Sequence, residues 1–309
     1  MTRELREIKE KTCHELMSQA LATKLNGRRG LDFSLCSIIN AKSGNCSEDC
    51  RFCVQSAHYH TNAPVYGLKE RDEILQAATL ARENQASHFS LVTSGRGLGA
   101  KDLKQAAEAI TAIREQIGIK VCASFGILGL LDFKMLKEAG LSRYHHNLET
   151  SREFFPNIVS THSFQERIAT INAAHEAGLE VCAGGIFGLG ETEDDRISMA
   201  LSLRDCGVDS VPINILIPLP GTPLAHQPPL LAIDALRGIA IYRILMPDIP
   251  IRLAAGRETA LRDFLGSAFM AGADGMMIGG YLTEHGRMPK DDLNFAAEMR
   301  QIWQEMIPA

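Results

Sequence analysis

FSLCSIINAKSGNCSEDCRFCVQSA, residues 33–57, joins an apolar run to a loop that contains Gly, Ser and three cysteines. The run 33–40 has the length and the β-branched content of a buried strand. The loop after it spaces Cys46, Cys50 and Cys53 as C-x₃-C-x₂-C. We interpret this segment as the first strand of the fold, followed by a loop that carries chemistry.

Short β-branched runs and longer segments of helical period alternate from this strand to the end of the chain. Strands are expected near 33–40, 88–94, 119–125, 142–147, 180–186, 209–216, 250–254 and 274–279. Helices are expected near 69–84, 100–117, 130–139, 163–178, 193–206, 228–245, 257–270 and 290–306. Eight strand–helix units without a Pro/Ser-rich linker predict an α/β fold of the (β/α)₈ TIM-barrel type. A doubly wound sheet is the alternative.

The chain has 309 residues and is 45% hydrophobic, which is enough to bury one large core. We interpret residues 1–309 as a single domain. Within it, 1–30 is expected to be an N-terminal helical extension, 31–280 the barrel, and 281–309 a C-terminal loop and helix.

Charge and cysteine content restrict the classes of function. A formal charge of −5, without a basic stripe and with 6% aromatic residues, argues against a surface for nucleic acid or for an anionic membrane. The first residues lack a signal-peptide pattern, and no apolar run reaches membrane-spanning length, so we expect a cytoplasmic protein. Eight cysteines, three of them crowded together, fit metal-binding thiols in a reducing compartment.

The loop with the three cysteines follows a strand, and active sites of barrels lie at that end of the strands. Three thiolates in a short loop can hold three corners of a cubane iron–sulfur cluster and leave one iron open to a ligand. Zinc is an alternative, with His58 or His60 as the fourth ligand. Burial of the cysteines as small apolar residues is another.

With Phe52 directly before its last cysteine, the run resembles the signature of the radical S-adenosylmethionine (SAM) superfamily. The resemblance implies that Cys46, Cys50 and Cys53 hold a [4Fe-4S] cluster whose open iron binds SAM. An electron from this cluster would then cleave SAM to methionine and a 5′-deoxyadenosyl radical.

Four further stretches resemble the biotin synthase family within that superfamily: YHHNLETS (144–151), VCAGGIFGLGET (181–192), VPINIL (211–216) and IRLAAGRE (251–258). This resemblance implies a sulfurtransferase that converts dethiobiotin to biotin, with sulfur from an auxiliary iron–sulfur cluster. It also implies a flavodoxin-type or ferredoxin-type electron donor, and homodimers are common in the family.

The same resemblance assigns roles to individual residues. Those expected to contact SAM are Phe52, Thr93, Ser94, Asn147, Glu149 and Arg167. Those expected to contact the substrate are His145, Asn147, Asn214 and Thr283. Arg167 would pair its guanidinium with the carboxylate of SAM, and Asn214 could both donate to and accept from the ureido ring. The chain departs from the family at His145, where Asn is usual, and at Glu284, where Thr is usual.

The auxiliary site departs further from the family. Most members hold a [2Fe-2S] cluster with three Cys and one Arg, and the second-strand Cys is replaced by Ser90 in this chain. The predicted strands one, three, five and seven instead carry Cys36, Cys122, Cys182 and Arg252. Because alternate strands of a barrel contribute one interior layer, these four could converge on a rearranged cluster. The resemblance to family members with such an altered ligand pattern implies a four-iron type, which we favour. The alternative is that the three cysteines are ordinary core residues.

Other functions remain open on sequence alone. The rival enzymes are radical SAM barrels similar to the hydrogenase maturase or to methylornithine synthase. A rival of another class is a non-catalytic iron–sulfur protein, which would have no need for Arg167 and Asn147.

Overall fold

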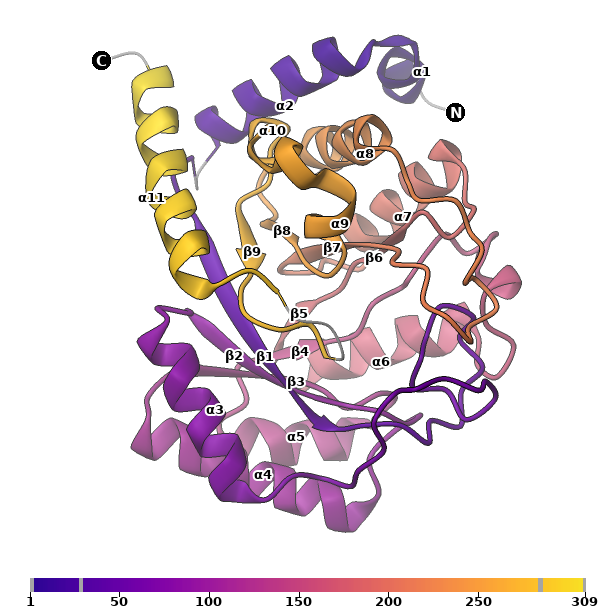
Figure 1. Cartoon of the computed structure of the whole chain (residues 1–309), viewed down its shortest axis with the longest axis vertical. Helices are drawn as coiled ribbons and strands as arrows, with labels where there is room; N and C mark the ends of the chain where they lie inside the picture. The colour runs from indigo at the N-terminus through magenta and orange to yellow at the C-terminus, as the bar shows by residue number, and fades with distance from the viewer. Residues whose placement is uncertain (1–2, 28–29, 283–285, 308–309) are drawn as a thin grey trace.

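The computed structural model describes residues 3–27, 30–282 and 286–307 (Figure 1). Within these residues, nine parallel strands form one sheet in the order β5-β4-β3-β2-β1-β9-β8-β7-β6. The strands are β1 (Ser34–Lys42), β2 (His88–Thr93), β3 (Lys120–Ser124), β4 (Arg143–His145), β5 (Glu180–Cys182), β6 (Gly185–Phe187), β7 (Val211–Ile215), β8 (Ile251–Leu253) and β9 (Gly275–Met277). The predicted α/β class is confirmed.

β5 and β6 are two halves of one run of chain, which closes the sheet into a barrel. On one side, the His146 amide donates to the Cys182 carbonyl at 3.0 Å. On the other side, the Asp209 amide donates to the Val181 carbonyl at 2.8 Å. Since this run is bonded to both of its neighbours, the sheet returns on itself. The TIM-type barrel is thus confirmed, and the doubly wound alternative is wrong.

The expected strand near 180–186 is interrupted at residues 183–184. A Cβ atom on Gly184 would lie 1.9 Å from the Pro212 carbonyl oxygen, so only glycine allows the neighbouring strand to approach so closely. The interruption therefore comes from a tight contact between two strands, which the local sequence pattern does not encode.

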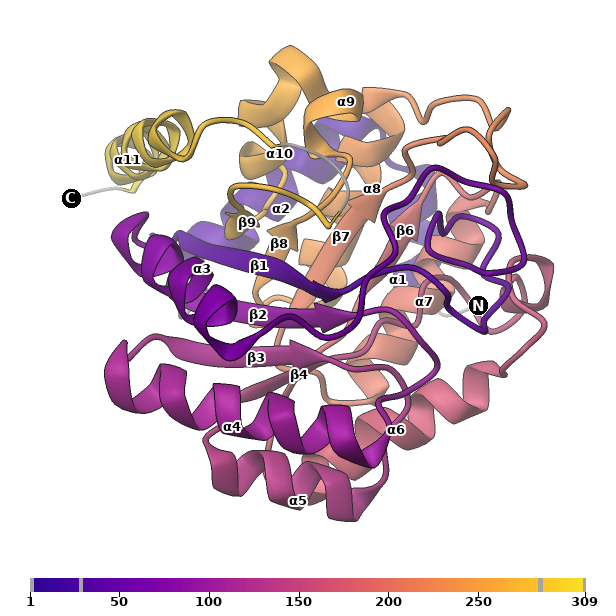
Figure 2. The ribbon, with the colours of Figure 1, turned by 60° about the horizontal axis from the view of Figure 1, so that its bottom comes forward.

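Helices cover the outside of the barrel, as Figure 2 shows for those beside β1 to β4. They are α3 (Arg71–Glu83), α4 (Ala100–Gln116), α5 (Leu130–Ala139), α6 (Phe164–Glu176), α7 (Glu193–Asp205), α8 (Ala232–Leu245), α9 (Arg257–Leu261), η2 (Arg262–Phe264) and α10 (Leu265–Met270). A short 3₁₀ helix, η1 (Phe155–Asn157), precedes α6. The helix expected near 257–270 is thus divided into three pieces, with the break at Arg262, whose φ is +45°. That left-handed conformation cannot continue an α-helix.

The ends of the chain pack on the barrel. At the N-terminus, α1 (Arg3–Glu10) is followed by α2 (Cys13–Asn26), which contacts α8 and α10. At the C-terminus, α11 (Pro289–Met306) buries Trp303 against the ring of Phe269. None of the described helices is long and apolar enough to cross a membrane. The predicted divisions after residues 30 and 280 stay an interpretation.

Candidate active site

The loop after β1 turns sharply before its first cysteine. Gly44 and Asn45 have positive φ values of +73° and +49°, and a Cβ on Gly44 would lie 2.6 Å from the Val65 side chain. Beyond the turn, the Cys46 amide donates to the Gln55 carbonyl at 2.9 Å, so the two ends of the cysteine loop are held together. This closure presents the three thiols from one compact loop.

Polar side chains within the loop anchor it to its surroundings. The Gln55 side-chain oxygen accepts from the Ser43 hydroxyl at 3.0 Å and from the Gly44 amide at 3.2 Å. The Glu48 carboxylate accepts from the Thr161 hydroxyl at 2.9 Å and from His162, in the segment that precedes α6. Sequence reasoning missed both residues, although Glu48 lies inside the cysteine motif and Gln55 two residues after it, because only the tertiary structure reveals their partners.

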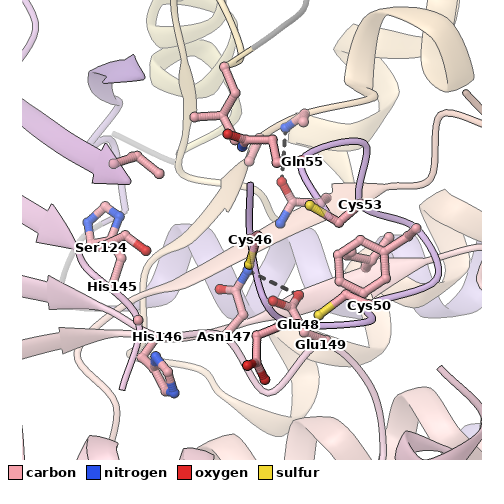
Figure 3. Close-up of a pocket in the computed structure, with 18 of the residues that line it drawn as sticks. Cys46, Glu48, Cys50, Cys53, Gln55, Ser124, His145, His146, Asn147 and Glu149 are labelled. Atoms are coloured by element: carbon pink, nitrogen blue, oxygen red, sulfur yellow. Dashed lines mark hydrogen bonds between the residues drawn. The ribbon is translucent and has the colours of Figure 1, made fainter. Parts of the chain in front are cut away.

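The three cysteines border a cavity of about 420 Å³ at the C-terminal mouth of the barrel. Figure 3 shows Cys46, Cys50 and Cys53 with Asn147 and Glu149 around the same part of this pocket. Burial raises the pKa of the Cys53 thiol to about 11, and it also raises the pKa of Cys50. Thiols with such pKa values become thiolates at neutral pH when a metal replaces the proton.

Most of the residues predicted to contact SAM or substrate line this cavity. They are Phe52, Thr93, His145, Asn147, Glu149, Arg167 and Asn214. Ser94 does not line it; its hydroxyl donates to the Gly44 carbonyl at 2.7 Å and so supports the cysteine loop. Thr283 and Glu284 lie outside the described residues.

Asn147, Glu149 and Arg167 form a buried polar group on one wall. The Asn147 side chain donates to Glu149 at 3.3 Å and accepts from the Gly184 amide at 3.1 Å. The Arg167 guanidinium donates to the Asn147 carbonyl at 2.9 Å and lies 3.7 Å from the Glu149 carboxylate. Burial raises the pKa of Glu149, and the charge of Arg167 opposes that rise. Each of these residues therefore helps to hold the other two.

His145 and Asn214 lie on other parts of the wall, at the ends of β4 and β7. Burial, with the nearby charges of Arg143 and Arg252, lowers the pKa of His145 to about 3, so its ring is neutral at physiological pH. The Asn214 side chain donates to the Gly185 carbonyl at 3.3 Å and accepts from the Ala255 amide at 3.1 Å. Since a carboxamide has two hydrogens and two lone pairs, one of each stays open toward the cavity.

A second group of cysteines lies deeper in the barrel. Ile38, Ser124 and Ala254 line the cavity, and side chains two residues apart on a strand share a face. Cys36 and Cys122 therefore face the interior one step below the cavity, as does Arg252. Cys182 belongs to the same group, because it interacts electrostatically with both Cys36 and Cys122.

The buried guanidinium of Arg252 has no carboxylate partner among the described residues. It donates to the Ser34 hydroxyl at 2.9 Å and to the Ser210 hydroxyl. A buried cation without a counter-charge is costly unless an anionic group binds beside it. Burial also raises the pKa of Cys36 and brings that of Cys122 to about 12. The buried thiols of Cys36 and Cys122 beside an uncompensated cation fit an anionic iron–sulfur cluster, whose iron would replace the thiol protons.

Arg143, on β4, also borders this deeper group and was missed by sequence reasoning. It interacts electrostatically with Cys122 and Cys182, and its Nε donates to Glu180 at 2.9 Å. An arginine two residues before the cavity-lining His145 was the available signal, since charged side chains are rare inside a barrel.

The zinc alternative gains no support from this geometry. In the described part of the chain, no three His, Cys, Asp or Glu side chains are grouped as ligands for one metal ion. The His58 ring instead bonds to the Ser47 carbonyl at 2.9 Å. A cluster differs from a single ion because its thiolates bind separate iron atoms.

Comparison with known proteins defines the class to which this barrel belongs. Residues 41–215 match the family model described as Radical SAM superfamily, and residues 212–300 match that of the Biotin and Thiamin Synthesis associated domain. The fold, and the three-cysteine loop at the mouth of the barrel, are therefore those of a radical SAM enzyme.

Individual relatives narrow this class. The chain is 51% identical over 266 residues to the biotin synthase of Pelotomaculum thermopropionicum, covering 86% of this chain and 83% of that relative. It is 45% identical over 293 residues to the biotin synthase of Nitratidesulfovibrio vulgaris, covering 95% and 81%. The chain belongs to the biotin synthase family, which confirms the resemblance seen in its motifs.

Solved structures share the fold at much lower identity. A methylornithine synthase matches with a TM-score of 0.79 at 18% identity, over 98% of this chain and 95% of that one. The FeFe-hydrogenase maturase of Carboxydothermus hydrogenoformans matches with 0.80 at 19% identity, over 94% and 72%. These two rivals have the same barrel, so the fold cannot separate them from biotin synthase and the sequence relatives decide.

Proposed function

We propose that this chain inserts sulfur into dethiobiotin to form biotin, at the cavity between the three-cysteine loop and the ends of β4 and β7. The observation that carries the proposal is the presence of two cysteine groups at two depths of one barrel. A radical SAM enzyme needs only the group at the mouth. The deeper group, with its uncompensated Arg252, supports a second cluster that serves as the sulfur source.

When bound, SAM and the cluster at Cys46, Cys50 and Cys53 would supply the radical that activates carbon, and the auxiliary cluster would supply the sulfur atom. The chain contributes binding and orientation. Its cavity lies directly above the deeper group, so a substrate bound there would stand between the two sets of cysteines. Phe52 and Thr93 would form part of the wall around SAM.

Arg167, Asn147 and Glu149 would hold SAM beside the cysteine loop. Arg167 keeps its buried Nε without a partner among the described residues, so the guanidinium has a donor left for a carboxylate. Glu149 could accept from ribose hydroxyls, and the bonds within the group orient it in advance.

His145 and Asn214 would bind the ureido ring of dethiobiotin. The open hydrogen and lone pair of Asn214 match the carbonyl and N–H of that ring. His145 stays neutral through its burial and so would act as a hydrogen-bond partner without adding charge. Thr283 remains our proposed contact to the substrate carboxylate.

For the auxiliary cluster we propose a four-iron type surrounded by Cys36, Cys122, Cys182 and Arg252. The side chains of Cys36 and Cys122 lie at the same depth below the cavity, which supports a shared site. Ser90 also faces the interior, yet its hydroxyl is a weaker metal ligand than a thiolate. From the family resemblance we further propose a flavodoxin-type or ferredoxin-type electron donor, a homodimer and a cytoplasmic location.

Anaerobic reconstitution, followed by iron and sulfide counting and an assay with dethiobiotin, tests this function. We expect two clusters per chain and biotin formation that depends on SAM and a reductant. Cys50→Ala is the control that should abolish SAM cleavage. Cleavage of SAM by the reconstituted chain without any biotin would mean that another small molecule is the substrate.

A further inference from the structure

His88 lies in the deeper group and has no role in the function proposed above. It begins β2, where the cavity-lining Val92 is four residues further along the strand. Side chains at i, i+2 and i+4 share one face, so His88 faces the barrel interior with Ser90 and Val92. The strand register places His88 directly opposite Cys36 on β1. The second strand therefore carries, one step below Ser90, a side chain of a type that can bind metals.

Hydrogen bonds determine which nitrogen of the His88 ring carries the proton. The Ser87 hydroxyl lies 2.9 Å from the Leu35 carbonyl and 2.9 Å from His88 Nδ1. A carbonyl oxygen can only accept, so the single hydroxyl hydrogen points to Leu35. With the hydroxyl hydrogen on Leu35, His88 Nδ1 is the donor to Ser87.

The other ring nitrogen, His88 Nε2, is left with a lone pair. It is buried and has no hydrogen-bond partner among the described residues, in a side chain that is only 9% exposed. Histidines that bind metals typically donate one ring N–H to an oxygen and present the other nitrogen to the metal. The Ser87–His88 pair has this arrangement without a metal being assumed.

The surroundings of His88 are those of the three interior cysteines. His88 interacts electrostatically with Arg143 and Arg252, and so do Cys36 and Cys122. Arg143 is paired with Glu180, whereas Arg252 has no carboxylate partner in the described chain. The imidazole, the thiols and the two guanidiniums thus border one interior space with an excess of positive charge.

We propose that His88 Nε2 is a fourth protein ligand of the auxiliary cluster, together with Cys36, Cys122 and Cys182. Histidine replaces cysteine as an iron ligand in some iron–sulfur clusters, so the donor type is chemically suitable. Three thiolates and one imidazole provide one ligand for each iron of a four-iron cluster, and Arg252 then compensates the charge of the cluster. This inference rests on the proposed function, because it assumes that a second cluster forms.

The test uses the full chain with Cys46→Ala, Cys50→Ala and Cys53→Ala combined, so that only the auxiliary cluster can assemble. This protein is produced once with ¹⁵N-histidine and once with ¹⁵N-arginine, reconstituted anaerobically, reduced, and measured by pulsed EPR. We expect a nitrogen coupling that changes with the histidine label and not with the arginine label. His88→Ala should lose this coupling completely, whereas His145→Ala should keep it.

His88→Cys keeps the test informative if the alanine variant does not fold. We expect it to retain the iron content of its parent and to lose the histidine coupling. A histidine coupling that persists in His88→Cys would overturn the inference, and so would a cluster that shows only the arginine label. Absence of any second cluster would overturn both this inference and the proposed function. A histidine coupling in the triple variant, together with SAM cleavage but no biotin formation by the unmutated chain, would support the ligand and reject the substrate.

Discussion

The two cysteine groups of this barrel differ in how the chain brings them together. Cys46, Cys50 and Cys53 lie in one loop, so their proximity is local and survives in almost any fold. Cys36, Cys122 and Cys182 come from β1, β3 and β5, and they meet only because the sheet closes. The first set, the mouth group, identifies a superfamily. The second set, the deeper group or interior group, depends on the whole barrel.

Their surroundings differ as well. The mouth group borders a cavity in whose wall Arg167 is paired with Glu149 at 3.7 Å. The interior group lies beside Arg252, which has only hydroxyl partners among the described residues. A site for exchangeable small molecules can have its buried charges paired before the ligand binds. A site for a resident anionic group can leave a cation unpaired, because the bound group compensates its charge.

The largest effect should come from breaking the mouth group alone. Cys50→Ala should reduce SAM cleavage to the background rate, because all three thiolates are needed to hold the cluster whose fourth iron stays open for SAM. Mössbauer spectra should still show the second cluster, since Cys50 takes no part in the interior group. Loss of both clusters in this variant would mean that the two groups do not assemble independently.

The next effect should come from breaking the interior group alone. Cys36→Ala should abolish biotin formation and the second cluster while SAM cleavage continues, because the cavity and the mouth thiols are unchanged. Ser90→Cys, on the neighbouring strand β2, is the matched control and should have little effect. If Cys36→Ala retains the second cluster and still makes biotin, the rearranged ligand set is wrong.

A smaller effect should appear in SAM binding. Arg167→Met should raise the KM for SAM about tenfold or more, since a hydrogen bond to a charged group contributes roughly 1.5–3 kcal/mol. Arg167→Lys should recover part of this loss, because it retains the charge without the fork geometry. Iron content is the control and should not change. An unaltered KM in Arg167→Met would remove this residue from the SAM site.

The smallest effect concerns stability rather than chemistry. Thr192 and Asp195 form a capping box at the start of α7, where the Thr192 amide donates to Asp195 at 2.9 Å. Thr192→Ala should lower the free energy of unfolding by about 1 kcal/mol, measured by denaturant titration, without changing iron content.

The same capping box predicts a pH dependence. Burial opposes ionisation of Asp195, but hydrogen bonds from Ser151 and Thr192 prevail and lower its pKa below 3.8. A carboxyl whose pKa is lower in the folded state contributes stability above its unfolded pKa and loses it as the pH falls through the folded pKa. The difference between Asp195→Asn and the parent should therefore shrink between pH 6 and about pH 3. A difference that is constant over this range would contradict the assignment.

The sequence predicted most of the fold, and the three-cysteine loop lies at the mouth of the barrel as expected. All eight expected strands are present, because buried strands and amphipathic helices have patterns that local composition reveals. The break at 183–184 and the division near Arg262 were not predicted, since each depends on contacts or backbone geometry set by distant chain. Glu48, Gln55, Arg143 and His88 were missed for the same reason, as their partners lie on other elements.

By itself, the sequence determined that this protein is a β/α barrel with a three-thiol loop at its mouth and a set of motifs shared with one enzyme family. These properties are encoded in short stretches, where residues that are close in the sequence are also close in the fold. The sequence suggested that the interior cysteines and Arg252 converge, but only the tertiary structure revealed that His88 faces the same interior and that Arg252 has no carboxylate partner among the described residues. The reason is that a closed sheet brings together residues more than two hundred positions apart, such as Ser34 and Arg252, through the register of its strands.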